Sequence, residues 1–274
     1  MTHLRAMVSL KLLRWELPFI CLLAWSAFIS IPLSLGEIGI SWDALNHHIY
    51  LGWTAEKPRF DSDFVAAGYQ SYQFPYLYWP VYKLATTGWS GVSAGLVLAT
   101  LHMVAVPPVW MLARVCMPGP TAFDAAMRMI AVALAFSTSV VLSLFDSSSN
   151  DLMAAAPLVW ALALGMEPIH QGRAAWLTPT RAILLSGMSA GIAVAFKLSN
   201  GPLAVLLPAV WLCSADTIPT RLRLVVAGSA ATLLGFVITY GYWGALLWNH
   251  FGNPVYPFYA PLFAPFRGMT GWQP

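Results

Sequence analysis

Residues 224–248 read LVVAGSAATLLGFVITYGYWGALLW, a run that contains no charged side chain. A helix needs roughly 20 apolar residues to cross the hydrocarbon of a bilayer, so this run is predicted to be a transmembrane helix. Six further segments share its apolar character: Leu17 to Leu35, Trp89 to Leu112, Met129 to Phe145, Leu152 to Met166, Ile183 to Phe196 and Pro202 to Cys213. We therefore predict an all-α membrane protein with about seven transmembrane helices.

The composition of the whole chain supports this class. Of its 274 residues, 58% are hydrophobic and 9% are charged, and the mean hydropathy is +0.66. A soluble domain carries about a quarter charged residues, so the composition excludes a soluble domain, a disordered chain and a nucleic-acid-binding module. Cys21, Cys116 and Cys213 show no metal-ligand spacing and are predicted to be free thiols.

The basic residues orient the chain in the membrane. A turn over residues 197–202, KLSNGP, keeps Lys197 away from the bilayer centre, where a charge costs about 2.5 to 3.5 kcal/mol. With that turn, nine of the 14 lysines and arginines, Arg128 and Arg173 among them, lie on one side. The positive-inside rule assigns that side to the cytoplasm. We predict a multi-pass protein of the inner (plasma) membrane, with a cytoplasmic N-terminus and Trp272 outside.

Most acidic residues lie on the opposite, extracytoplasmic side. This side holds seven of the eleven, together with the first extracytoplasmic loop, residues 36–88, and a C-terminal segment, residues 249–274. Any chemistry is therefore expected on the extracytoplasmic face of what is otherwise a single transmembrane module, residues 1–274.

A first candidate site begins the first extracytoplasmic loop. If the chain is helical after Ser41, then Asp43, His47 and Tyr50 lie on one face, and a carboxylate beside an imidazole and a phenol suits general-base catalysis. Two other interpretations stay open: Asp43 caps the helix, or Asp43 and His47 bind a divalent metal with further carboxylates. These are Asp61, Asp63, Asp146 and Asp151. His48 points about 100° away from His47 on an α-helix, so the two do not easily act together.

Polar residues at two later turns form a second candidate site. Asp146 and Asp151 flank a short outer loop, and the helix dipole alone could account for Asp151 at a helix start. Lys197 and Asn200 offer a cation and an amide at the depth of a lipid phosphate, although Lys197 could also simply snorkel.

An aromatic-rich stretch, residues 66–82, reads AAGYQSYQFPYLYWPVY. It cannot span a bilayer, and we expect it to lie in the headgroup plane as an aromatic belt, over which a lipid-linked substrate could enter.

Four blocks of sequence, in this order, resemble the C-type superfamily of integral-membrane glycosyltransferases: SWDALNHHIY (41–50), RFD with AAGYQSY (59–61 and 66–72), FKLSN (196–200) and FGNPVYPF (251–258). The resemblance implies transfer of a sugar from a polyprenyl-phosphate donor on the extracytoplasmic side. It implies that Asp43 is the catalytic base or orients the acceptor, and that membrane-parallel amphipathic helices follow it in the first loop. Where the related branch more often has Asn-Tyr-His, this chain has Asn46-His47-His48, so His48 aligns with the family histidine and His47 is a substitution.

The sequence thus predicts a glycosyltransferase of the cell envelope, or the catalytic half of one, acting on a lipid or glycan acceptor. Asp43, His47 and His48 are the predicted catalytic residues, and the predicted substrate-binding residues are Lys197, Asn200, Asp146, Asp151, Asp61 and Tyr50. No cofactor is required, because the phosphate carries the leaving group, although a divalent metal near Asp43 stays open.

Alternatives to this activity also follow from the sequence. Pro107-Pro108 and Pro157 would be hinges in a multi-pass transporter or lipid flippase, and a non-catalytic or truncated scaffold is a third interpretation. Because the chain stops soon after residue 258, we expect a further module to be missing. A second membrane subunit or a second copy could then pack against small residues, namely Gly187, Gly191, Gly228 and Gly235.

Overall fold

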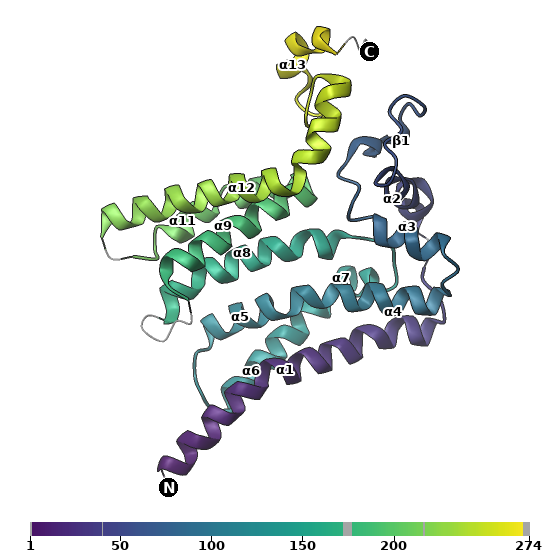
Figure 1. Ribbon diagram of the computed structural model, residues 1–274. Coiled ribbons are helices and arrows are strands. Elements are labelled where there is room, and N and C mark those ends of the chain that lie inside the picture. The colour runs from purple at the N-terminus through teal and green to yellow at the C-terminus, as the bar shows by residue number, and fades with distance from the viewer. Residues whose placement is uncertain (1, 40, 172–176, 216, 271–274) are drawn as a thin grey trace.

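The protein is a bundle of helices that run side by side (Figure 1). The computed structural model describes residues 2–39, 41–171, 177–215 and 217–270; Arg173 and Trp272 lie outside the described residues. The longer helices are α1 (Thr2–Leu35), α4 (Gly91–Leu101), α5 (Val106–Cys116), α6 (Ala122–Phe136), α8 (Asp151–Gln171), α9 (Pro179–Phe196) and α12 (Ile218–Phe251).

Shorter elements connect these helices. They are η1 (Ala44–His48), α2 (Ile49–Thr54), β1 (Ala66–Tyr69), η2 (Gln70–Tyr72), α3 (Trp79–Thr86), η3 (His102–Ala105), α7 (Ser139–Leu144), η5 (Leu198–Asn200), α10 (Gly201–Ala204), α11 (Leu207–Trp211), α13 (Ala260–Phe263) and η6 (Ala264–Met269). The prediction of a helical membrane protein is confirmed, with one four-residue strand, β1, in the first loop.

Five segments of the described chain are long and apolar enough to cross a membrane. They are Trp15–Leu35, Gly91–Cys116, Asp151–Ile169, Pro179–Phe196 and Ile218–Phe251. The two other predicted spans are interrupted. Met129 to Phe145 divides between α6 and α7, because the Thr138 side chain accepts a hydrogen bond from the backbone N–H of Val141 and starts a new helix. Pro202 to Cys213 divides between α10 and α11, each of which has a proline in its first turn.

The break around residues 197–202 is confirmed. Helix α9 ends at Phe196, and the backbone at Lys197 is extended before η5 begins. Lys197 therefore lies at a turn and not in the middle of one long helix.

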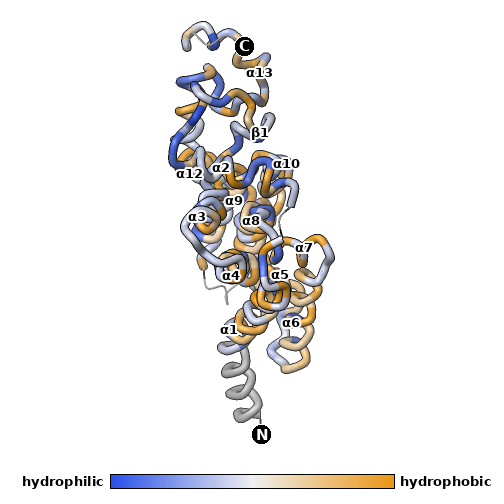
Figure 2. Tube along the Cα trace, turned by 90° about the vertical axis from the view of Figure 1, so that its right-hand side faces the viewer, coloured by the Kyte–Doolittle hydropathy of each residue, from blue (hydrophilic) through white to orange (hydrophobic). Residues whose placement is uncertain are grey.

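Two sets of connections meet at opposite ends of the bundle. Residues 36–39, 41–90, 145–150 and 197–200 gather at what we call the loop end, toward the right of Figure 1, and residues 252–270 continue it at the top. The N-terminus and residues 117–121 lie at the N-terminal end. Figure 2 looks onto the loop end; most of the helical tube is hydrophobic, and hydrophilic segments lie near β1, α10 and the end of α12.

Helices α9 and α12 approach closely through glycines. A Cβ atom at Gly187 would lie 2.2 Å from the carbonyl oxygen of Gly228, and one at Gly191 would lie 2.0 Å from that of Thr232. A Cβ at Gly235 would lie 2.4 Å from the carbonyl oxygen of Met188. The prediction that these glycines form a surface for a second subunit is wrong, because they are already used inside the chain.

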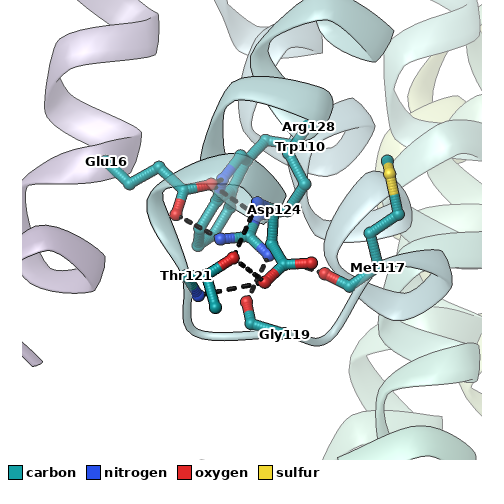
Figure 3. Close-up of polar contacts among 7 residues, drawn as sticks. All are labelled: Glu16, Trp110, Met117, Gly119, Thr121, Asp124 and Arg128. Carbon is teal, nitrogen blue, oxygen red and sulfur yellow. Dashed lines mark hydrogen bonds and ion pairs between the residues drawn. The ribbon is translucent and has the colours of Figure 1, made fainter. Parts of the chain in front are cut away.

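A buried ion pair holds α1 to α6 at the N-terminal end (Figure 3). The Arg128 guanidinium donates to both carboxylate oxygens of Glu16, at 2.6 and 2.7 Å, and to the carbonyl oxygens of Met117 and Gly119. Trp110 Nε1 donates a further bond of 2.8 Å to Glu16. Arg128 is 0% exposed and lies in α6, so it is a buried structural group and not a loop residue.

Candidate functional site

The site at the loop end starts with a π-helical turn that carries two histidines. The Ser41 hydroxyl accepts a 3.0 Å hydrogen bond from the N–H of Ala44, whereas the Asp43 side chain makes no capping bond. The interpretation of Asp43 as a helix cap is therefore wrong, because Ser41 does this. The Asp43 carboxylate is 55% exposed, with one oxygen 3.7 Å from Nδ1 of His47.

The π-helix η1 changes which residues share a face. A π-turn holds more residues than an α-turn, so His47 and His48 both point inward, 4% and 5% exposed, with their ring centres 4.4 Å apart. This differs from the expectation that the two histidines, about 100° apart on an α-helix, do not easily act together. Tyr50 points elsewhere: its hydroxyl donates to Asp63 at 3.4 Å, and burial raises its pKa to about 12. Tyr50 therefore does not join Asp43 and His47 as a base.

Side chains from the first loop and from the loop before α8 hold His48 in place. Its Nδ1 lies 2.7 Å from Oγ of Ser148, and its ring stacks on that of Tyr78, with centres 5.0 Å apart. Tyr78 is in turn hydrogen-bonded to Asn150. Burial lowers the pKa of His48 to about 4, so this imidazole is neutral at pH 7.

His47 has a less complete environment. Its Nδ1 is buried and has no hydrogen-bond partner among the described residues. Burial lowers the pKa of His47, while the nearby Asp43 carboxylate opposes this shift. The exposed Asp43 carboxylate next to this imidazole is the group that can accept a proton from a bound molecule.

Lys197 lies close to the same histidines. Its ammonium forms an ion pair with the carboxylate of Asp151, which also accepts a 2.9 Å bond from the hydroxyl of Ser149. Lys197 and Asp151 both contribute to the electrostatic environment of His47. Three segments that are distant in the sequence thus meet at one end of the bundle: the first loop with its carboxylate and two imidazoles, the start of α8 with Asp151, and the end of α9 with Lys197.

Three other predicted residues have structural contacts. The Asn200 amide donates both of its hydrogens, to the carbonyl oxygens of Ala154 and Ala193 at 3.0 and 2.9 Å, so it has none left for a phosphate. Asp146 accepts a 3.0 Å bond from the N–H of Gly39, which ties the first loop to the loop before α8. Asp61 is 92% exposed in its side chain, and its nearest ionic partner is His250, at 3.5 Å.

The carboxylates proposed to complete a metal site do not converge. Asp63 pairs with Arg59, Asp151 with Lys197 and Asp61 with His250. Among the described residues, no three His, Cys, Asp or Glu side chains form a group that could hold a metal ion.

The aromatic stretch 66–82 packs largely inside the protein. Tyr72, Phe74 and Tyr78 are 3%, 7% and 5% exposed, and Trp243 Nε1 donates a 3.1 Å bond to the carbonyl oxygen of Tyr72. The prediction of a belt in the headgroup plane is wrong for these three residues, because Tyr72 and Phe74 pack against α12 and Tyr78 packs against His47 and His48. Tyr69 and Trp79 are exposed.

Sequence analysis did not identify Tyr78, Ser148, Asn150 and His102 as part of this region. His102 is 2% exposed at the break between α4 and α5, and it hydrogen-bonds to the backbone of Ser149. A polar serine and asparagine run before α8 was visible in the sequence, but His48, the partner of Ser148, lies 100 residues away along the chain.

No protein-family model, no curated protein and no solved structure matches this chain. The function is therefore argued from the site itself.

Proposed function

We propose that this protein is a membrane glycosyltransferase that moves a sugar from a polyprenyl-phosphate donor to an extracytoplasmic lipid or glycan acceptor. One observation carries the proposal: Asp43, two neutral histidines and Lys197 meet at the loop end of an apolar bundle. A base beside a cation is the pairing that transfer from a phosphate-linked sugar requires.

The reaction assigns a separate role to each group. The acceptor hydroxyl attacks the anomeric carbon of the donor sugar and gives its proton to Asp43, with His47 next to it. The bond between the anomeric carbon and the phosphate oxygen breaks, and its electron pair stays on the lipid phosphate. Lys197 stabilises the negative charge that grows there, an interaction that is stronger in the transition state than in the ground state.

The predicted membrane topology is consistent with this assignment. With the N-terminus in the cytoplasm, seven passes of the chain, two of them through the interrupted segments α6–α7 and α10–α11, put the whole loop end outside. The inner membrane is the compartment in which a polyprenyl carrier would be met, and α2 and α3 are the candidates for helices along its surface.

An apolar groove offers a place for the donor chain. It has a volume of about 480 Å³ between α9, α11 and α12, and its lining includes Val194, Gly201, Trp211 and Phe236. Val194 and Gly201 flank the Lys197 turn in the sequence, so a chain in this groove would bring its phosphate toward Lys197.

A transporter or lipid flippase is the second candidate, favoured by the buried His102 at a helix break. His102 hydrogen-bonds to Ser149, which belongs to the loop end. This contact lies at one end of the bundle, whereas a transport site must be reached from both sides of the membrane. The polar groups described above lie mainly at one end, which supports an enzyme.

The test is donor turnover by the whole chain in liposomes that contain a radiolabelled polyprenyl-phosphate hexose. We expect lipid phosphate to be released and sugar to appear on an added acceptor lipid. Asp43→Asn should abolish this, and Ser41→Ala, which removes the neighbouring cap but not the base, is the matched control. Release of lipid phosphate no faster than in liposomes without the protein would contradict the proposal. Movement of the unmodified donor lipid between leaflets would favour the flippase.

A further inference from the structure

Residues 252–270, which follow α12, form a folded segment that we call the C-terminal arm. The arm begins at Gly252, whose left-handed backbone (φ 65°) ends α12, and it contains α13 and η6. The ring centre of Trp248 lies 5.5 Å from that of Phe266 and 6.4 Å from that of Phe263. A Cβ atom at Gly252 would lie 2.8 Å from the carbonyl oxygen of Phe266. The arm is therefore packed closely against the end of α12.

The C-terminal arm lies across the direction of the bundle. Helix α12 has 34 residues, a length of about 51 Å at 1.5 Å per residue, whereas about 20 residues cross the hydrocarbon of a bilayer. Figure 1 shows the last turns of α12 turning away from the direction of the other long helices, with α13 beyond the side of the bundle, and Figure 2 shows the same displacement. The long apolar helices are the segments that can cross a membrane. A segment that lies across them at the loop end would run along the surface of the bilayer.

The outward face of the C-terminal arm is apolar. Tyr259, Leu262 and Met269 are 71%, 70% and 76% exposed. The other exposed residues between 258 and 269 are also uncharged: Phe258, Pro261, Ala264, Pro265, Phe266 and Gly268. The charged residue of the arm, Arg267, is partly buried and donates a 3.4 Å hydrogen bond to the carbonyl oxygen of Ala260. A contiguous apolar face of this kind marks a contact surface and not a surface in water.

The composition of this face favours lipid over protein as its partner. A specific protein interface has a polar rim and roughly one hydrogen bond per 100 to 200 Å². Among the exposed residues of the arm, the hydroxyl of Tyr259 is the one hydrogen-bonding group on a side chain. Aromatic and aliphatic side chains close to an arginine are instead typical of segments at the boundary between headgroups and acyl chains.

The backbone of the C-terminal arm also suits a region with little water. Four of its residues are prolines and have no N–H group: Pro254, Pro257, Pro261 and Pro265. The N–H groups of Phe258, Leu262 and Thr270 donate to carbonyl oxygens three residues earlier, at 2.9, 2.9 and 3.1 Å. Because an unpaired backbone group is costly where water is scarce, these features lower the cost of placing the arm at the bilayer.

We propose that the C-terminal arm is a lipid-binding element, inserted into the surface of the bilayer at the loop end. Tyr259, Leu262 and Met269 reach the ends of the acyl chains, and Arg267 lies at the level of the headgroups. This inference does not depend on the sugar-transfer reaction, because it uses only the shape and composition of the arm.

Insertion of the arm would also position the first loop. The ring of Tyr256 stacks on that of Phe251, with centres 4.1 Å apart, and meets the ring of Tyr72 edge to face, with centres 4.7 Å apart. Tyr72 belongs to the first loop, which also carries Asp43 and His47. The lipid surface would thus set the height at which this loop lies above the membrane.

The test places fluorescent labels on the full chain in phosphatidylcholine liposomes. The three native thiols are first removed by Cys21→Ala, Cys116→Ser and Cys213→Ser. A polarity-sensitive fluorophore is then attached to Leu262→Cys or to Met269→Cys. Lys57→Cys, at an exposed position of the first loop, is the matched control. We expect both arm labels to emit at shorter wavelength than the control label and to lose intensity when brominated phosphatidylcholine replaces the ordinary lipid.

A second pair of variants tests whether the apolar face itself inserts. With the label at Met269→Cys, Tyr259→Asp combined with Leu262→Asp should abolish quenching by the brominated lipid. Tyr259→Phe combined with Leu262→Met should preserve it. Both side chains are exposed, so the unfolding midpoint in detergent should be the same for the two combinations.

Three results would overturn the proposal. Emission from both arm labels at the wavelength of the control would place the arm in water. Emission at short wavelength that brominated lipid does not quench, and that is lost as the protein is diluted in lipid, would assign the apolar face to a second copy of the chain. Quenching that survives both aspartates would show that this face does not hold the arm at the membrane.

Discussion

The ammonium of Lys197 pairs with the carboxylate of Asp151, which joins the end of α9 to the start of α8. Both side chains are exposed, at 42% and 55%, and an exposed ion pair contributes only about 0.2 to 1 kcal/mol. The pair is thus strong enough to orient Lys197 and weak enough for a phosphate to replace it. Under the proposed function, Asp151 would act as an internal substitute for the donor phosphate.

Asp151→Asn is therefore expected to tighten binding of the sugarless polyprenyl phosphate by about 1.4- to 5-fold, the equivalent of breaking one exposed pair. Lys197→Met should weaken it by about 10- to 150-fold, the loss of a charge-assisted hydrogen bond. Native mass spectrometry of the purified protein measures both. If Asp151→Asn weakened binding, Asp151 would be a direct contact of the ligand and not its competitor.

Asp43→Asn should lower sugar transfer by about 10²- to 10⁴-fold, because the amide keeps the shape of the side chain and cannot accept a proton. The thermal unfolding midpoint should not change, since Asp43 is half-exposed and caps no helix. Steady-state transfer and the midpoint are measured on the same preparation. If the rate of sugar transfer fell less than tenfold, Asp43 would not be the base.

The buried His48 makes stability depend on pH. Its pKa in the folded protein is about 4, below the ordinary value near 6.5, so the unfolded chain binds a proton first as the pH falls. Its contribution to stability is complete above about pH 6.5 and is lost as the pH falls toward 4. His48→Gln should flatten the decline of the unfolding midpoint between pH 6.5 and 4.5. The same slope in the variant would mean that other groups cause the decline.

Gly191→Ala should destabilise the protein, because the new Cβ would lie 2.0 Å from the carbonyl oxygen of Thr232 and push α9 away from α12. Gly241→Ala is the control, since its Cβ would meet only a methyl group of Val237, at 3.7 Å. Unfolding midpoints in detergent compare the two. Equal unfolding midpoints for the two variants would show that moving α9 away from α12 does not lower the stability of the protein.

The topology can be checked with native thiols. Cys116, the last residue of α5, and Cys213, two residues after α11, are exposed, and the predicted topology puts both on the cytoplasmic side, so an impermeant maleimide should label them only after lysis. Lys57→Cys, in the exposed part of the first loop, should be labelled in intact cells. The reverse pattern would reverse the orientation of the bundle.

The sequence allowed the helical class and five membrane-crossing segments to be predicted, because apolar length marks such segments. Contacts between distant residues could not be predicted in this way. No pattern indicates that Ser148 would meet His48, or that Asp146 would hold the backbone of Gly39.

Two local features explain the remaining differences. A π-turn over residues 44–48 inserts one residue into the helical period, which brings both histidines inward and turns Tyr50 toward Asp63. The glycines of α9 and α12 have the spacing of a close helix contact, but that spacing does not say whether the partner is in the same chain.

The pair between Glu16 and Arg128 has a consequence for how the protein is made. Glu16 leaves the ribosome 112 residues before Arg128, and an unpaired carboxylate costs several kcal/mol to bury. Until α6 is synthesised, α1 must keep Glu16 in contact with water at the membrane surface. We therefore expect the first half of the bundle to close only after α6, which carries Arg128, has been synthesised.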